Sequence, residues 1–75
     1  MKINHREWTI DSVPQKQGRH WHAWVEVARG PWEHEILGQI YHFTDIGHYD
    51  TVRAAEARGI EWAKVWLDSN FEALA

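Results

Sequence analysis

The chain changes its pattern of apolar and polar residues once, near Asp50. Before that point, apolar residues alternate with polar ones over residues 6–11 and again over residues 20–28, which is the period of a half-buried β-strand. Residues 36–43 form a β-branched and aromatic run that suits a third strand. We therefore predict three consecutive strands in the first two-thirds of the chain.

Proline and glycine separate the predicted strands. Ser12–Arg19 contains Pro14 and Gly18 among polar residues, so we predict a flexible hairpin loop centred near Gln15. Gly30–Pro31 ends the second strand. Because consecutive strands tend to lie side by side, this order predicts an antiparallel meander.

After Asp50 the period becomes 3.6 residues, which predicts a helix. Asp50 or Thr51 is the expected N-cap, since either side chain can accept a hydrogen bond from the first helical turn. Gly59 lies within the apolar stripe, where glycine costs about 1 kcal/mol relative to alanine, so we expect a strand or a tryptophan ring to approach closely there. The stripe comprises Val52, Ala55, Gly59, Trp62, Ala63 and Trp66, with Trp62 and Trp66 seated on the sheet.

Together these elements predict an α+β domain of order β-β-β-α, in which a three-stranded antiparallel meander carries one C-terminal helix across one face. The loop positions predict Ile10 opposite Trp21 and Val27 opposite Leu37. We expect a single domain over residues 1–75, with residues 1–5 and 70–75 free to move. The face toward the helix would hold Trp8, Ile10, Trp21, Ala23, Val25, Val27, Leu37, Gln39, Tyr41 and Phe43.

One helix covers only one face of such a sheet. Trp24 and Ile40 then lie on the other face, where they would meet water unless something else covers them. We expect the protein to self-associate through this face or through a sheet edge.

Composition narrows the function classes. The 75 residues include six tryptophans and no cysteine, which excludes disulfides and thiol chemistry and fits a cytoplasmic protein. The formal charge of -3, with scattered basic residues, disfavours nucleic acid as a partner. The chain has neither a signal-peptide pattern nor an apolar run that could span a membrane, so we expect no membrane partner.

The segment from Tyr49 to Asp68 resembles the closing helix of small uncharacterised bacterial β-β-β-α proteins, with the pattern G-[LI]-x-W-A-x-x-W-[ILV]-D at Gly59–Asp68. The resemblance extends loosely to Trp21–Val25 and implies a short antiparallel sheet with a C-terminal helix and no assigned activity. The order of elements is also similar to the partial double-stranded-RNA-binding-like fold of HicB-type antitoxins. That similarity implies nucleic-acid binding as an alternative.

Histidines provide the candidate metal ligands. His20 and His22 lie on the same side of one predicted strand, and the predicted register puts His42 across from His22. Three neutral imidazoles with an open fourth position suit zinc or copper. Ordinary surface histidines explain the pattern more simply, so the expected cofactor is none and metal binding remains an alternative.

Catalysis is not expected. Glu26 and the segment Glu33–Glu35 could supply acid and base groups, but no nucleophile or phosphate-binding glycine loop accompanies them.

We therefore interpret the chain as a non-enzymatic module that binds a protein, first of all a second copy of itself. The nucleic-acid alternative would place His20, His22, Arg19 and Arg29 on phosphate, with Trp24 or Trp32 stacking on bases. The candidate interaction residues are Trp24, Ile40, His20, His22 and Trp32.

Overall fold

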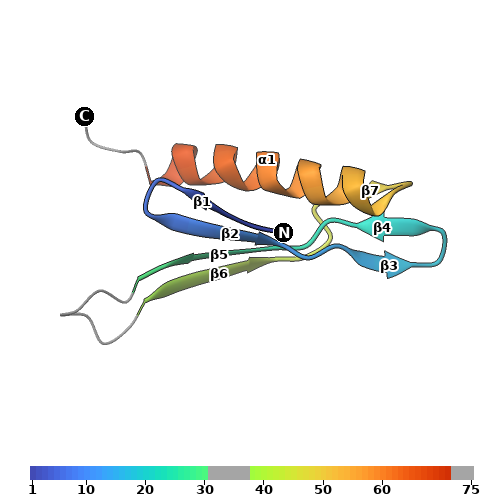
Figure 1. Cartoon of the computed structure of the whole chain (residues 1–75), viewed down its shortest axis with the longest axis horizontal. Helices are drawn as coiled ribbons and strands as arrows, with labels where there is room; N and C mark the ends of the chain where they lie inside the picture. The colour runs from blue at the N-terminus through green and yellow to red at the C-terminus, as the bar shows by residue number, and fades with distance from the viewer. Residues whose placement is uncertain (31–37, 72–75) are drawn as a thin grey trace.

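The computed structural model describes residues 1–30 and 38–71, and it contains one long helix packed on antiparallel β-structure (Figure 1). The α+β class and the C-terminal helix on one side of the sheet are therefore confirmed. The elements are β1 (Lys2–His5), β2 (Trp8–Ser12), β3 (Gln15–Gln17), β4 (His20–His22), β5 (Val25–Arg29), β6 (Gln39–Phe43), β7 (His48–Tyr49) and α1 (Val52–Asn70).

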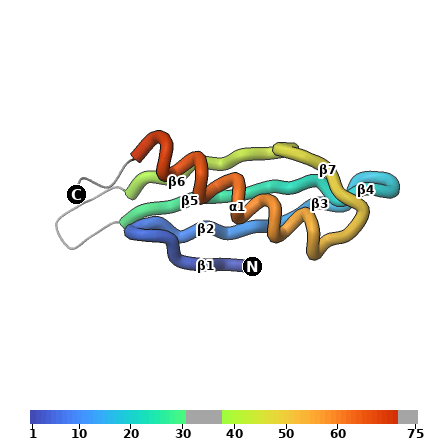
Figure 2. The backbone as a smooth tube through the Cα atoms, turned by 90° about the horizontal axis from the view of Figure 1, so that it is seen from above, coloured from blue at the N-terminus to red at the C-terminus, as the bar shows by residue number. Residues whose placement is uncertain are grey.

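The predicted three-stranded meander is wrong. In the described residues, seven strands form a four-stranded sheet of order β1-β2-β5-β6 and a three-stranded sheet of order β3-β4-β7. All neighbouring strands are antiparallel. The two sheets follow one another along the long axis of the molecule, with the same chain segments passing from one to the other (Figures 1 and 2).

The predicted loop Ser12–Arg19 is in fact part of a long hairpin. The β2–β5 register continues without a shift into the β3–β4 register, and the Val13 N–H donates to the Trp24 carbonyl (2.8 Å) between them. The hairpin turns at Gly18–Arg19, where Gly18 has φ +62°, as a two-residue turn with glycine first requires. Gln15–Gln17 has no apolar residue, so alternation gave no sign of a strand there.

This hairpin changes the predicted pairing. Ile10 pairs with Val27 rather than Trp21, and Val27 pairs with Tyr41 rather than Leu37, which lies outside the described residues. Both partners move by an even number of residues, so each side chain keeps its face. Ile10 and Val27 are fully buried under α1, as the alternation predicted.

The N-terminal segment adds the edge strand β1. Residues 2–5 belong to the segment expected to be free to move, and they pair with β2 through Lys2–Asp11 to His5–Trp8. The turn between the strands contains Arg6 with φ +57°. Polar residues alternate with Ile3 in this segment, which is too short to distinguish a strand from a tail by its sequence.

Between β6 and β7 the chain bulges. β6 pairs with β5 as far as Phe43 with Val25, whereas the Ala23 N–H donates to the Gly47 carbonyl (2.9 Å). Thr44, Asp45 and Ile46 therefore lie opposite Trp24 alone. Asp45 has φ +54°. The bulge sets the register of β7.

Helix α1 begins where the sequence predicted, because the Thr51 hydroxyl accepts a hydrogen bond from the Ala54 N–H (3.1 Å). It crosses the sheet obliquely (Figure 2) and contacts β2 and β5. Gly59 allows close approach, since an added Cβ would lie 2.9 Å from Ser12 Oγ and 3.0 Å from Val25 Cγ2. The expected close strand is therefore present.

The tryptophans of α1 lie beside the core and not at its centre. Trp62 is 36% exposed and packs edge-on against Phe43, and Trp66 packs against Phe43 and Tyr41. They cover the β6 side of the sheet, because Tyr41 and Phe43 belong to β6. The buried face of the helix consists of Ala55, Gly59, Ile60, Ala63 and Leu67. No helix in the described part of the chain has the length and apolar character needed to cross a membrane.

Candidate functional site

The sheet face opposite α1, here called the uncovered face, has alternating apolar and charged rows. One row contains Thr9, Ala28 and Ile40, because Ala28 pairs with both of the others. The adjacent row contains Lys2, Asp11, Glu26 and His42, and a third contains Val13 and Trp24. As predicted, Trp24 and Ile40 are on the side of the sheet away from the helix.

The middle row is the charged row of this face. Asp11 and Glu26 are directly opposite each other on neighbouring strands, where like charges are destabilising. Lys2 lies opposite Asp11 on its other side, and the N-terminal ammonium is 3.9 Å from Asp11 Oδ1. His42 Nδ1 lies 3.4 Å from Glu26 Oε2. A partner on this face would therefore have to cover a row of charged side chains.

Trp24 is half-buried and borders a shallow cavity. Its indole nitrogen is buried, and among the described residues it has no acceptor. The cavity has a volume of about 320 Å³ and is lined by Val13, Gln15, Trp24, Val25, Glu26, His42, Phe43 and Thr44. That volume is at the lower end of the range for small-molecule sites.

Strand β6 is more exposed to solvent than Trp24 and the cavity beside it. It is the outer strand of its sheet, and no other strand in residues 1–30 and 38–71 pairs with its free side. Ile40, its second residue, is 58% exposed. The sequence of β6, Gln39–Phe43, has no lysine, arginine, aspartate or glutamate, although charges on edge strands are a common protection against pairing with another chain.

The residues of the nucleic-acid alternative do not share a surface. Arg29 lies on the helix side of the sheet, where its guanidinium is 4.9 Å from the ring centre of the buried Trp8. Trp24 is on the uncovered face. Arg19 is at the hairpin turn, and Trp32 lies outside the described residues, as do Glu33–Glu35.

The predicted metal ligands are also separated. His42 pairs with Glu26 in β6, whereas His22 pairs with His48 in β7. The prediction that His42 faces His22 is wrong, because the hairpin register and the bulge at Asp45 both differ from the simple meander. A two-residue strand such as β7 leaves no periodic signal, so sequence reasoning missed His48.

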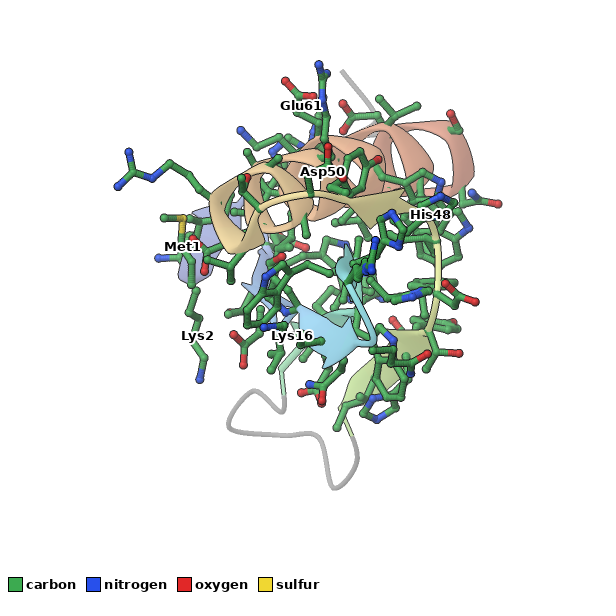
Figure 3. All side chains as sticks on the ribbon, turned by 90° about the vertical axis from the view of Figure 1, so that its right-hand side faces the viewer. Met1, Lys2, Lys16, His48, Asp50 and Glu61 are labelled. Atoms are coloured by element: carbon green, nitrogen blue, oxygen red, sulfur yellow. The ribbon has the colours of Figure 1, made fainter. Side chains whose placement is uncertain are left out.

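The structure instead forms a group of His20, His22 and His48, here called the histidine cluster. The ring centre of His48 lies 5.1 Å from that of His20 and 5.9 Å from that of His22. His22 Nδ1 lies 2.5 Å from Asp45 Oδ1, and His20 Nε2 lies 3.8 Å from Asp50 Oδ1. Figure 3 views this end of the molecule, with His48 and Asp50 labelled.

The cluster does not hold a ready-made metal site. Within the described residues, no group of three or more histidine, aspartate or glutamate side chains is placed to bind one metal ion. Its members come from β4 and from β7, and the bulge between β6 and β7 contributes Asp45 beside His22.

One carboxylate has a clearly shifted pKa. The hydrogen bond between His5 Nε2 and Asp68 Oδ1 (2.9 Å) lowers the pKa of Asp68, and the nearby Arg6 lowers it further. These contacts join the β1–β2 turn to the last turns of α1. Their position indicates a structural role.

Comparison of the chain with protein-family models, with curated proteins and with solved structures finds no match.

Proposed function

We propose that this chain is a non-enzymatic protein-interaction module that self-associates by pairing β6 with β6 of a second copy. The observation that carries the proposal is the outer edge of β6, with which no other described strand pairs, which has no lysine, arginine, aspartate or glutamate, and on which Ile40 is 58% exposed. An edge strand of this kind offers unpaired backbone donors and acceptors to another strand. A second copy supplies an identical strand.

Charge favours the edge over the uncovered face. Two faces stacked on each other would bury the charged rows of both copies, including Lys2, Asp11 and Glu26, and removing charged groups from water is costly. Pairing along β6 leaves those carboxylates in water and involves only Gln39–Phe43. The other edge strand, β1, includes Lys2, which opposes such pairing.

Side-chain parity limits the geometry of the pair. In an antiparallel pair, the side chains of two opposite residues project to the same side of the sheet. A β6 residue whose side chain faces α1 must therefore lie opposite another such residue in the second copy. A two-fold axis at Tyr41 satisfies this condition, and it places Ile40 beside the partner's His42. The result is one continuous sheet through both copies, with both helices on the same side.

Sedimentation velocity over a range of protein concentrations tests the proposal. We expect the wild type to form a concentration-dependent dimer. Ile40→Lys should be monomeric, because it places a charge in the middle of the pairing strand. Ile40 is exposed, so the substitution leaves the fold intact, which circular dichroism checks.

Two matched variants introduce the same charge elsewhere. Val65→Lys changes a residue of α1 that is 66% exposed, and Val13→Lys changes a residue of the uncovered face that is 46% exposed. Both should remain dimeric. A monomeric wild type overturns self-association, whereas dissociation by Val13→Lys and not by Ile40→Lys overturns the edge and assigns the contact to the face.

A further inference from the structure

We propose that His20, His22 and His48 form a binding site for one divalent transition-metal ion, such as Zn²⁺, with Asp45 as the positioning residue for His22. The site differs from the triplet that the sequence indicated, because His48 takes the place of His42. It is also independent of dimer formation through β6. The argument rests on ring spacing, on the Asp45–His22 contact and on exposure.

The ring spacings fit one shared ion. Two imidazoles that bind a tetrahedral zinc ion through nitrogens at about 2.0–2.1 Å have their ring centres roughly 5 Å apart. The centres of His20 and His48 are 5.1 Å apart, and those of His22 and His48 are 5.9 Å apart. His48 is therefore close to the required separation from each of the other two rings.

Asp45 prepares His22 for this role. Its Oδ1 lies 2.5 Å from His22 Nδ1, so the tautomer with its proton on Nδ1 donates a hydrogen bond to this carboxylate. The neutral ring then presents Nε2 with a free electron pair, which is the arrangement of carboxylate, histidine and metal found in zinc sites. The left-handed backbone at Asp45 (φ +54°) belongs to the bulge that sets the β7 register.

The other two ligands must turn to meet the ion. The donor atoms of the cluster do not converge in this structure. His20 and His48 are exposed, however, and exposed side chains change rotamer within nanoseconds. His20 Nε2 is 3.8 Å from Asp50, whose side chain is 92% exposed, so the ion competes only with a weak surface ion pair.

The surrounding charges suit a cation. Asp45 and Asp50 both lie within 4 Å of a ring nitrogen of the cluster and offset the positive charge of a bound ion. Three protein ligands leave a fourth position open to water. The chemistry of neutral imidazole selects zinc, copper or nickel over calcium or magnesium.

Isothermal titration of the metal-free full chain with ZnCl₂ tests the proposal. We expect one Zn²⁺ per chain, and both His22→Gln and His48→Gln should weaken binding more than tenfold. His42→Gln is the matched control, because it removes an exposed histidine near Glu26 rather than in the cluster. It should leave the affinity unchanged.

The positioning role of Asp45 has its own measurement. Asp45→Ala should weaken Zn²⁺ binding by about 10–100-fold, the usual effect of removing an outer partner of a metal-bound histidine. In the metal-free variant, nitrogen–proton correlation spectra should show His22 shifting from the Nδ1–H to the Nε2–H tautomer. A purely structural role of Asp45 would change stability without changing the tautomer.

Several results would overturn the site. Unchanged affinity in His48→Gln or His22→Gln would exclude these ligands, and equal loss in His42→Gln would indicate nonspecific binding. A stoichiometry of one ion per two chains would mean that the ion bridges copies. A wild-type dissociation constant weaker than about 0.1 mM, corresponding to less than about 5.5 kcal/mol of binding free energy, would also overturn it.

Discussion

Gly59 is the position where the structure makes an unusual prediction about stability. Replacing glycine by alanine within a helix ordinarily stabilises a protein by about 1 kcal/mol. Here the new methyl group would lie 2.9 Å from Ser12 Oγ and 3.0 Å from Val25 Cγ2, closer than such atoms normally approach. We therefore expect Gly59→Ala to destabilise the fold.

The magnitude follows from two opposing contributions. Overpacking a core typically costs about 1–3 kcal/mol. Ser12 is fully buried and donates to the Glu56 carbonyl (3.0 Å), so displacing its hydroxyl loses a hydrogen bond worth about 1 kcal/mol. After subtracting the gain in helix propensity, the net loss is about 1–3 kcal/mol, and each kilocalorie lowers the melting temperature by roughly 4–8 °C.

Urea unfolding followed by tryptophan fluorescence measures this loss. Ala57→Gly, at an exposed position of the same helix, calibrates the propensity term and should cost about 1 kcal/mol. In a Ser12→Ala background the closest contact is gone, so Gly59→Ala should cost at least about 0.5 kcal/mol less than in the wild type. A stabilised Gly59→Ala, or an equal penalty in both backgrounds, would refute the close contact as the cause.

Two further predictions concern residues in the C-terminal half of α1. Because folding lowers the pKa of Asp68, the contribution of this carboxylate to stability is complete above its ordinary pKa and disappears as the pH falls through the lower folded value. The difference in stability between the wild type and Asp68→Asn should therefore shrink below about pH 4. Acid unfolding curves of the two proteins that stay parallel would contradict this. Trp66 packs against Tyr41, Phe43 and Phe71, whereas Trp62 packs against Phe43. In urea unfolding, Trp66→Ala should therefore cost about 1–3 kcal/mol more stability than Trp62→Ala. Equal losses in the two variants would contradict this.

The comparison of sequence and structure shows which kinds of information each carries. Alternation over residues 6–11 and 20–28 predicted which side chains face the helix, and Ile10 and Val27 are fully buried there. Thr51 predicted the start of α1, because a capping side chain acts on its own next turn. Gly59 predicted a close strand, since a helix with glycine in its buried stripe needs a compensating contact.

The residues that meet in the candidate sites depend on which strands pair and in which register, and the sequence did not reveal this. A strand shifted by an even number of residues keeps the same buried face, so the hydrophobic pattern could not distinguish Ile10–Trp21 from the observed Ile10–Val27. The polar strand β3 and the two-residue β7 carry no hydrophobic period. For this reason His48 took the place predicted for His42.

By itself, the amino-acid sequence determined the local and periodic features of this protein: its class, the inward and outward faces of the strands with clear alternation, and the start of its helix. These follow from interactions between residues a few positions apart. Only the tertiary structure decided the hairpin turn at Gly18–Arg19, the bulge at Asp45 and, through them, the meeting of His22 with His48. Those outcomes required hydrogen bonds between distant segments, whose register the alternation of side chains leaves open by any even number of residues.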